Sequence, residues 1–137
     1  MSISRPTGLC LIVCLLGCSP KVPLYPVTGT VEYQGKPLTT GVVAFHHSDG
    51  VSPLAKGEIQ QDGKFTLETF QPGDGAVAGD YSVTVSSMIP GHGIEGQDAD
   101  YRPPKPLIPI KYMRLLETPL KASVEEKENV IKLSLKP

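Results

Sequence analysis

Val27-Thr28-Gly29-Thr30-Val31-Glu32-Tyr33-Gln34-Gly35-Lys36-Pro37 is the clearest structural signal in this sequence. From Val27 to Tyr33, residues suited to a core alternate with polar residues, which is the two-residue period of a strand with one buried face. The next four residues have turn composition, with a glycine that accepts positive φ. The stretch therefore predicts a half-buried β-strand that ends in a tight turn.

The same alternation recurs along the chain. Val43 and Phe45 are expected to point inward from one strand, and so are Tyr81, Val83 and Val85 from another. Asp62-Gly63 favours a tight hairpin turn between two further strands. Ile131, Leu133 and Leu135 form the inward face of the last strand. The predicted strands cover residues 27–33, 41–47, 55–60, 65–67, 80–85, 120–124 and 130–135.

Proline and glycine, 14 of each, separate these segments and leave no helix of useful length. Residues 88–119 are the exception to the strand rhythm, because they hold six prolines and show no clear element except one helical turn at 111–116. Seven short antiparallel strands joined by polar turns predict an all-β domain at 27–137, folded as a two-layer β-sandwich.

The N-terminus carries a different signal. Leu9–Leu16 is apolar but too short to cross a bilayer, which needs about 20 residues. It follows Arg5 and has the length of the apolar core of a secretory signal. Leu15-Leu16-Gly17-Cys18 resembles the lipobox of bacterial lipoproteins. The resemblance implies that residues 1–17 are a signal peptide and that Cys18 becomes an acylated first residue, carrying palmitate-type chains. An ordinary signal peptide and a retained hydrophobic start are the alternatives.

Export would change the cysteine content. Cys10 and Cys14 would leave with the signal and Cys18 would carry lipid, so the mature domain would have no disulfide and would depend on its apolar core. Residues 18–26 then form a stiff, proline-rich tether. Ser19, where an aspartate would suggest retention at the inner membrane, favours the outer membrane or cell surface, facing the periplasm or the exterior. The net charge of −1 gives no footprint for nucleic acid.

Several short turn and strand motifs follow one another along the domain: Val27–Val31, Gly35–Leu38, Val42–Phe45, Asp62–Phe65, Gly79–Val85, Ile108-Pro109-x-Lys111-Tyr112, Thr118–Leu120 and Asn129. Taken in order, they resemble the carboxypeptidase regulatory-like domain, a prealbumin-like (transthyretin-like) sandwich found in small lipoproteins of planctomycete bacteria. The resemblance implies a seven-stranded Greek-key sandwich that acts as an accessory or interaction module. Transthyretin-like folds also include carriers and hydrolases, but no matching catalytic histidine and arginine motif is found here.

Metal binding has little support in the sequence. His46 and His47 are adjacent on a strand and therefore point to opposite faces, one half-buried and one exposed. A site made of His46, His92 and either Asp98 or Asp100 has no ligand spacing behind it. The aspartates suit calcium chemically but lack the loop pattern of a calcium hand; they are Asp74, Asp80, Asp98 and Asp100. We expect no metal and no cofactor.

Catalytic motifs are equally weak. Ser86, Ser87 and Ser123 do not stand in a Gly-x-Ser-x-Gly elbow. The spacing Gly91-x-Gly93-x-x-Gly96 lacks the strand-to-helix context of a phosphate loop. Acidic residues around a predicted turn form a solvated face; they are Glu125, Glu126 and Glu128. We therefore expect no catalytic residues.

The expected function is that of a membrane-anchored, non-enzymatic structural or interaction module of the cell envelope. It would bind a protein or glycan through the sandwich edges and the 88–119 loop, where Tyr101, Tyr112 and Met113 supply contact surface. Alternatively, Tyr112 and Leu115 simply cover an open end of the core, which we favour for Tyr112. The competing function is a small-ligand carrier or transthyretin-like hydrolase using the same loop, which requires a concave pocket with converging polar groups. The sequence leaves the partner and the oligomeric state open.

Overall fold

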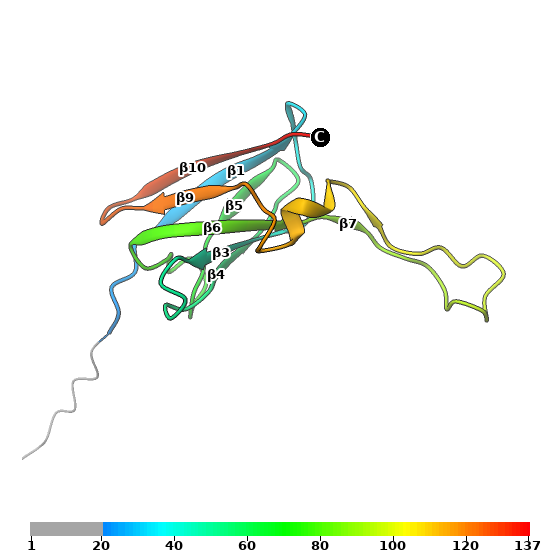
Figure 1. The fold of residues 1–137 in the computed structure, drawn as a ribbon, viewed down its shortest axis with the longest axis horizontal. Helices are drawn as coiled ribbons and strands as arrows, with labels where there is room; N and C mark the ends of the chain where they lie inside the picture. The colour runs from blue at the N-terminus through cyan, green and yellow to red at the C-terminus, as the bar shows by residue number, and fades with distance from the viewer. Residues whose placement is uncertain (1–20) are drawn as a thin grey trace, which may run out of the picture.

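The computed structural model describes residues 21–137, and this part of the chain is all-β (Figure 1). It contains ten strands and a single turn of 3-10 helix. Two four-stranded sheets pack face to face as a sandwich, and a two-stranded hairpin projects from it. The elements are β1 (Val27–Tyr33), β2 (Lys36–Pro37), β3 (Val42–His47), β4 (Ala55–Glu58), β5 (Lys64–Thr66), β6 (Gly79–Ser86), β7 (Met88–Ile89), β8 (Lys105–Pro106), η1 (Ile110–Met113), β9 (Lys121–Val124) and β10 (Asn129–Leu135).

The first sheet is built around β1. β10 pairs with β1 in parallel, with Val27 opposite Asn129 and Tyr33 opposite Leu135. β2 and β5 pair with β1 antiparallel. The second sheet is antiparallel throughout, in the order β4-β3-β6-β9.

All seven predicted strands are present, with ends that differ by a few residues at most. The prediction that every strand pairs antiparallel was wrong, because β10 runs parallel to β1. β9 and β10 are joined by a short turn but belong to different sheets, so they need not pair with each other. The count was also too low, since β2, β7 and β8 are two-residue strands that alternation over so short a length cannot reveal.

Aromatic rings join the two sheets at the centre of the core. The Phe45 ring of β3 lies 6.1 Å from Phe65 of β5 and 5.7 Å from Tyr81 of β6, measured between ring centroids. Tilted contacts at these distances are favourable for aromatic pairs. The aliphatic residues predicted to point inward are buried around these rings, including Val27, Val31, Val43, Val83, Val85, Leu133 and Leu135.

The segment before β1 is already attached to the sandwich. Tyr25 and Ala76 exchange two backbone hydrogen bonds, of 2.9 and 3.0 Å. The Pro26 carbonyl accepts a hydrogen bond from the Asn129 backbone N–H at 2.9 Å. The last two residues of the predicted tether, Tyr25 and Pro26, are therefore paired with the domain.

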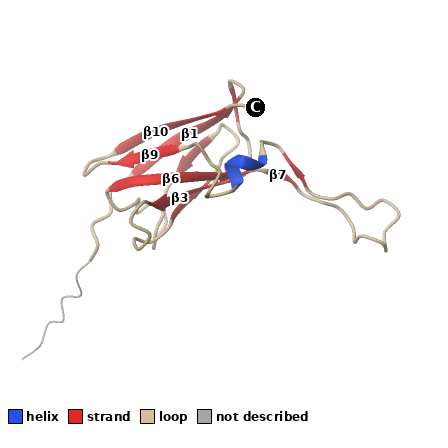
Figure 2. Ribbon diagram, in the orientation of Figure 1, coloured by secondary structure: helices blue, strands red, loops and turns tan. Residues whose placement is uncertain are grey.

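The two ends of the sandwich differ (Figure 2). At one end the chain enters, beside the loops at 48–54 and 69–78 and the β9–β10 turn at 125–128. At the other end lie η1 and the projecting β7–β8 hairpin. No helix within residues 21–137 is long and apolar enough to cross a membrane.

Candidate functional site

Residues 88–106, here called the arm, form a hairpin that leaves the sandwich after β6 (Figure 1). Met88 pairs with Pro106 and Ile89 with Lys105. Beyond this ladder, His92 and Arg102 exchange backbone hydrogen bonds of 2.8 and 2.9 Å. The arm is therefore held by backbone pairing along its length and is not a free loop.

The tip of the arm has its own hydrogen bonds. The Asp98 carboxylate accepts a hydrogen bond from the Ile94 backbone N–H at 2.6 Å, and Tyr101 N–H donates to the Asp98 carbonyl at 3.2 Å. His92 Nε2 lies 3.1 Å from an Asp100 carboxylate oxygen. Asp98 and Asp100, weighed as metal ligands, thus serve the internal structure of the arm.

The arm's side chains face water. None of residues 88–106 is buried, and Ile94 and Ile89 are 59% and 48% exposed. Met88, at the base of the arm, and Leu107, just beyond it, are each 37% exposed. The arm therefore exposes aliphatic side chains among its charged residues, and these side chains do not cover the core of the sandwich.

The base of the arm is fixed to the sandwich. Ser87 is buried and its hydroxyl donates to the Thr40 carbonyl at 2.7 Å, while Leu107 N–H donates to the Ser87 carbonyl at 2.9 Å. Ser87, weighed as a nucleophile, is thus a structural hydroxyl. These hydrogen bonds fix the base of the arm to the end of β6.

Tyr112 of η1 covers the end of the core, as favoured from the sequence. It is 2% exposed, and its hydroxyl donates to the Lys136 carbonyl at 2.9 Å and accepts from the Lys136 N–H at 2.7 Å. Met113 also packs against the core. The matching prediction for Leu115 was wrong, because its side chain is 45% exposed. Of the three predicted contact residues, Tyr101 alone belongs to the arm.

His46 and His47 are adjacent on β3, whereas His92 lies on the arm. His46 Nε2 is 3.0 Å from the Thr84 hydroxyl, and partial burial lowers the pKa of His46. His47 packs edge-on against Tyr81 and its Nε2 is 3.1 Å from the Ala78 carbonyl. Both strand histidines are half-buried, so the prediction that one is exposed was wrong. Within residues 21–137, no three His, Cys, Asp or Glu side chains are grouped to hold a metal ion.

The remaining polar candidates also have local partners. The Ser123 hydroxyl donates to Asp80 at 2.6 Å, and Lys121 Nζ donates to the Ser82 hydroxyl at 2.7 Å, both on the outer face of the second sheet. Ser86 is exposed at the end of β6. The acidic residues Glu125, Glu126 and Glu128 occupy the exposed β9–β10 turn. In the described part of the chain, no hydrogen bond joins one of the candidate serines to a histidine.

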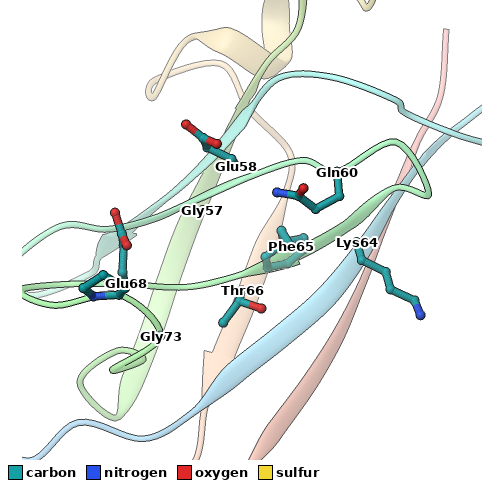
Figure 3. Close-up of a pocket in the computed structure, with 9 residues that line it drawn as sticks. Gly57, Glu58, Gln60, Lys64, Phe65, Thr66, Glu68 and Gly73 are labelled. Carbon is teal, nitrogen blue, oxygen red and sulfur yellow. The ribbon is translucent and has the colours of Figure 1, made fainter.

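A hollow of ≈ 520 Å³ lies between β4 and β5 and away from residues 88–119 (Figure 3). Its acidic groups, Glu58 and Glu68, are directed away from Lys64. Gln60, Phe65 and Thr66 also line it. The charged side chains of this hollow therefore do not converge on one point, as the polar groups of a small-ligand pocket do.

Two features escaped prediction and one predicted site cannot be placed. The pairing of the arm was missed because its strands are two residues long and carry prolines. The exposed apolar residues at the chain-entry end, described below, were missed because they lie in loops without periodicity. Cys18, the predicted lipidation site, lies outside the described residues.

Comparison with known proteins adds little. No family model matches the chain, and no curated protein matches it. Among solved structures, the chain is similar to a 9R-lipoxygenase from Cyanothece PCC8801, with 14% identity and a TM-score of 0.41. The match covers 84% of this chain and 16% of the lipoxygenase chain. A likeness at this level assigns neither a family nor an activity.

Proposed function

We propose that this chain is an exported protein held on a membrane by lipid on Cys18. Its sandwich, of the Greek-key prealbumin-like type, serves as a non-enzymatic interaction module of the cell envelope. The arm binds the partner, which is an envelope protein or glycan. The resemblance of Leu15–Cys18 to a lipobox supports the anchor, and the arm supports the interaction role.

The arm is the observation that carries this proposal. Ordering a chain segment costs about 1–2 kcal/mol per residue in conformational entropy, and burial of a core normally offsets that cost. None of the residues of the arm, 88–106, is buried, so the order of the arm depends on its own hydrogen bonds. A structured, exposed hairpin on a rigid scaffold is the usual setting for recognition. The arm also projects from the end opposite to chain entry, so it extends away from an anchor at Cys18 (Figure 1).

The carrier or hydrolase alternative has less support. It needs polar groups that converge on a pocket near residues 88–119. The hollow between β4 and β5 lies elsewhere, and its charged side chains diverge (Figure 3). An arm that presents exposed aliphatic and charged residues fits a protein or glycan surface better than an enclosed small molecule.

Shortening the arm tests the interaction role. Replacing residues 90–104 with Asn-Gly joins Ile89 to Lys105 through a two-residue hairpin turn and keeps the β7–β8 ladder. The wild type, the shortened variant and a control variant, all anchored, are crosslinked in intact envelopes, and the molecules that each captures are compared. We expect the wild-type partner to disappear from the shortened variant and to remain with Val130→Ser, a control on the exposed face of β10. Equal capture by all three proteins would contradict the proposal.

The anchor is tested separately with Cys18→Ser. Membrane fractionation and intact mass of the protein are measured in a bacterium that processes lipoproteins. We expect the wild type to carry acyl chains and sediment with membranes. If the variant still sediments with membranes as a mature species, lipid on Cys18 is not what holds the protein.

A further inference from the structure

Four exposed apolar residues gather at the end where the chain enters. Val51 is 87% exposed, Phe70 67%, Val22 49% and Leu54 46%. We call these four residues the apolar rim. Val51 and Leu54 lie on the β3–β4 loop, Phe70 follows β5, and Val22 belongs to the segment that leads into the domain.

The members of the apolar rim lie on segments at one end of the sandwich. Val22 and Phe70 line one shallow recess together with Lys21 and Leu24. Lys56 pairs antiparallel with Glu68, so the segments that carry Leu54 and Phe70 leave this bridge on the same side. Val51 belongs to the loop that carries Leu54. The rim therefore gathers exposed apolar residues from three segments, and such a grouping marks an interaction surface more often than isolated apolar residues do.

Two sets of hydrogen bonds between side chain and backbone hold the rim loops in place. The Asp49 carboxylate accepts hydrogen bonds from the Val51 and Ser52 N–H groups, each at 2.9 Å. The Asp74 carboxylate accepts from the Phe70 N–H at 2.9 Å and the Thr69 N–H at 2.7 Å. The backbone donors of Val51 and Phe70 thus have acceptors within their own loops, at the surface of the protein. That is the condition for placing a loop in apolar surroundings, where an unpaired N–H is costly.

Hydrogen bonding also keeps these carboxylates ionised. The Ser52 hydroxyl and two backbone N–H groups lower the pKa of Asp49. Burial alone would raise the pKa of Asp74, but the N–H groups of Thr69, Gln71 and Phe70 outweigh it and lower the pKa. The two loops therefore keep their shape over the range in which both carboxylates carry charge.

The rim lies close to the predicted anchor. Lys21 is the third residue after Cys18, so a fully extended chain separates them by about 10 Å. A lipid on Cys18 fixes that residue at the membrane surface. The end of the sandwich that bears the rim then has to stay near the headgroups, and an apolar face there sinks about 5–10 Å into the interface.

We propose that the apolar rim inserts into the headgroup–acyl boundary of the membrane that anchors the protein. The occupant of the rim is lipid, and the insertion sets the orientation of the sandwich so that the arm points away from the bilayer. This inference rests on the proposed lipid anchor, because the anchor brings the rim to the surface.

The charges at this end fit a tilted orientation. The rim loop at 48–54 leads into β4, whereas the acidic turn at 125–128 leaves β9, and these strands form opposite edges of the second sheet. Inserting the rim therefore leaves Glu126 and Glu128 in water. Lys21 and Asp74 both line the recess of Val22 and Phe70, so a headgroup there meets one cation and one carboxylate.

Depth-sensitive labels on the full lipidated chain test the proposal. Phe70→Cys and Leu54→Cys each place one free thiol in the rim, and Ile94→Cys places one on the arm as the matched exposed control. Each protein is labelled with an environment-sensitive fluorophore and reconstituted into vesicles of phosphatidylethanolamine and phosphatidylglycerol. Quenchers carried on the acyl chains report contact with lipid, and intact mass reports acylation of Cys18.

We expect both rim labels to shift their emission to the blue and to lose fluorescence to the lipid-borne quenchers, while the Ile94 label does neither. An acylated protein whose rim labels behave like the arm label overturns the docking and leaves the anchor standing. A blue shift without lipid quenching means that a second copy or another segment covers the rim, which also overturns it. A chain without acyl groups on Cys18 overturns the anchor itself, and the docking with it.

Discussion

Gly29 shows how one small residue lets the first sheet pack. It sits in the middle of β1, between Ile131 of β10 and Phe65 of β5. A Cβ on Gly29 would collide with the Ile131 carbonyl oxygen and with the Phe65 ring. Glycine inside a strand commonly marks such a close approach. The alternation of Val27 to Tyr33 predicts that Gly29 faces inward, and the structure adds that Phe65 fills the space above it.

Gly29→Ala is therefore expected to destabilise the fold by about 2–3 kcal/mol, because the crowded core must shift to accept a methyl group. Urea unfolding followed by circular dichroism measures the change. Gly50→Ala is the comparison: an added Cβ there meets nothing within 4 Å, so this variant should lose only about 1 kcal/mol, from the backbone strain that alanine has at φ of 67°. If the two variants lose equal stability, packing against Phe65 is not what requires glycine at position 29.

Asn129 connects three parts of the chain-entry end. Its side-chain NH₂ group donates to the Lys127 carbonyl at 2.6 Å and to the Glu125 carbonyl at 3.1 Å. Its side-chain oxygen, Oδ1, accepts from the Glu125 N–H at 2.9 Å. Its backbone N–H bonds the Pro26 carbonyl. The residue is 6% exposed.

Asn129→Ala keeps the backbone bond to Pro26 but leaves the partly buried backbone groups of Glu125 and Lys127 without their side-chain partner. We expect a loss of about 2 kcal/mol in the free energy of unfolding. The same urea titration measures it. Lys127→Ala serves as the control, because it removes a solvent-exposed ion pair with Glu125 from the same turn and should change stability little. A comparable loss in both variants would show that the turn, and not the amide, matters.

At the level of elements, the arm is separate from the folding core. It contributes no buried side chain, and its base is fixed by Ser87 and Leu107. The shortened arm, with residues 90–104 replaced by Asn-Gly, should therefore change the free energy of unfolding by less than about 1 kcal/mol. Thermal unfolding of wild type and variant checks this. A large loss would mean that the arm supports the sandwich, and its role as a recognition element would lose its basis.

The strands were predictable because their evidence is local. Alternation in β1, β3, β6 and β10 reflects burial of one face, and the same residues form the core in the structure. The parallel pairing of β1 with β10 was not predictable, because a burial pattern carries no information about the direction of the neighbouring strand. The arm's pairing and the apolar rim depend on contacts between loops, which no period in the sequence encodes.

On the scale of the whole molecule, Tyr81 couples the packing of the core to the protonation state of one hydroxyl group. Its ring packs against Phe45 and His47, and its hydroxyl donates to the Val77 carbonyl at 2.7 Å. Burial, with a smaller contribution from the negative charge of Asp49, raises the pKa of Tyr81 to about 12 from the ordinary 10.0. The folded state therefore holds this proton more tightly than the unfolded state does.

Stability should then fall as the pH rises from 10.0 toward about 12, because only the unfolded chain releases the Tyr81 proton readily in that window. Below pH 10.0 the contribution is complete. Tyr81→Phe loses the hydrogen bond to the Val77 carbonyl, which lowers the free energy of unfolding by about 1 kcal/mol at neutral pH. As the pH rises through the alkaline window, the stability of this variant should fall less than that of the wild type. Urea unfolding at neutral pH and within the alkaline window measures both slopes. Tyr33→Phe leaves Tyr81 in place and should keep the wild-type slope of stability against pH. If Tyr81→Phe also keeps that slope, alkaline unfolding does not begin at Tyr81.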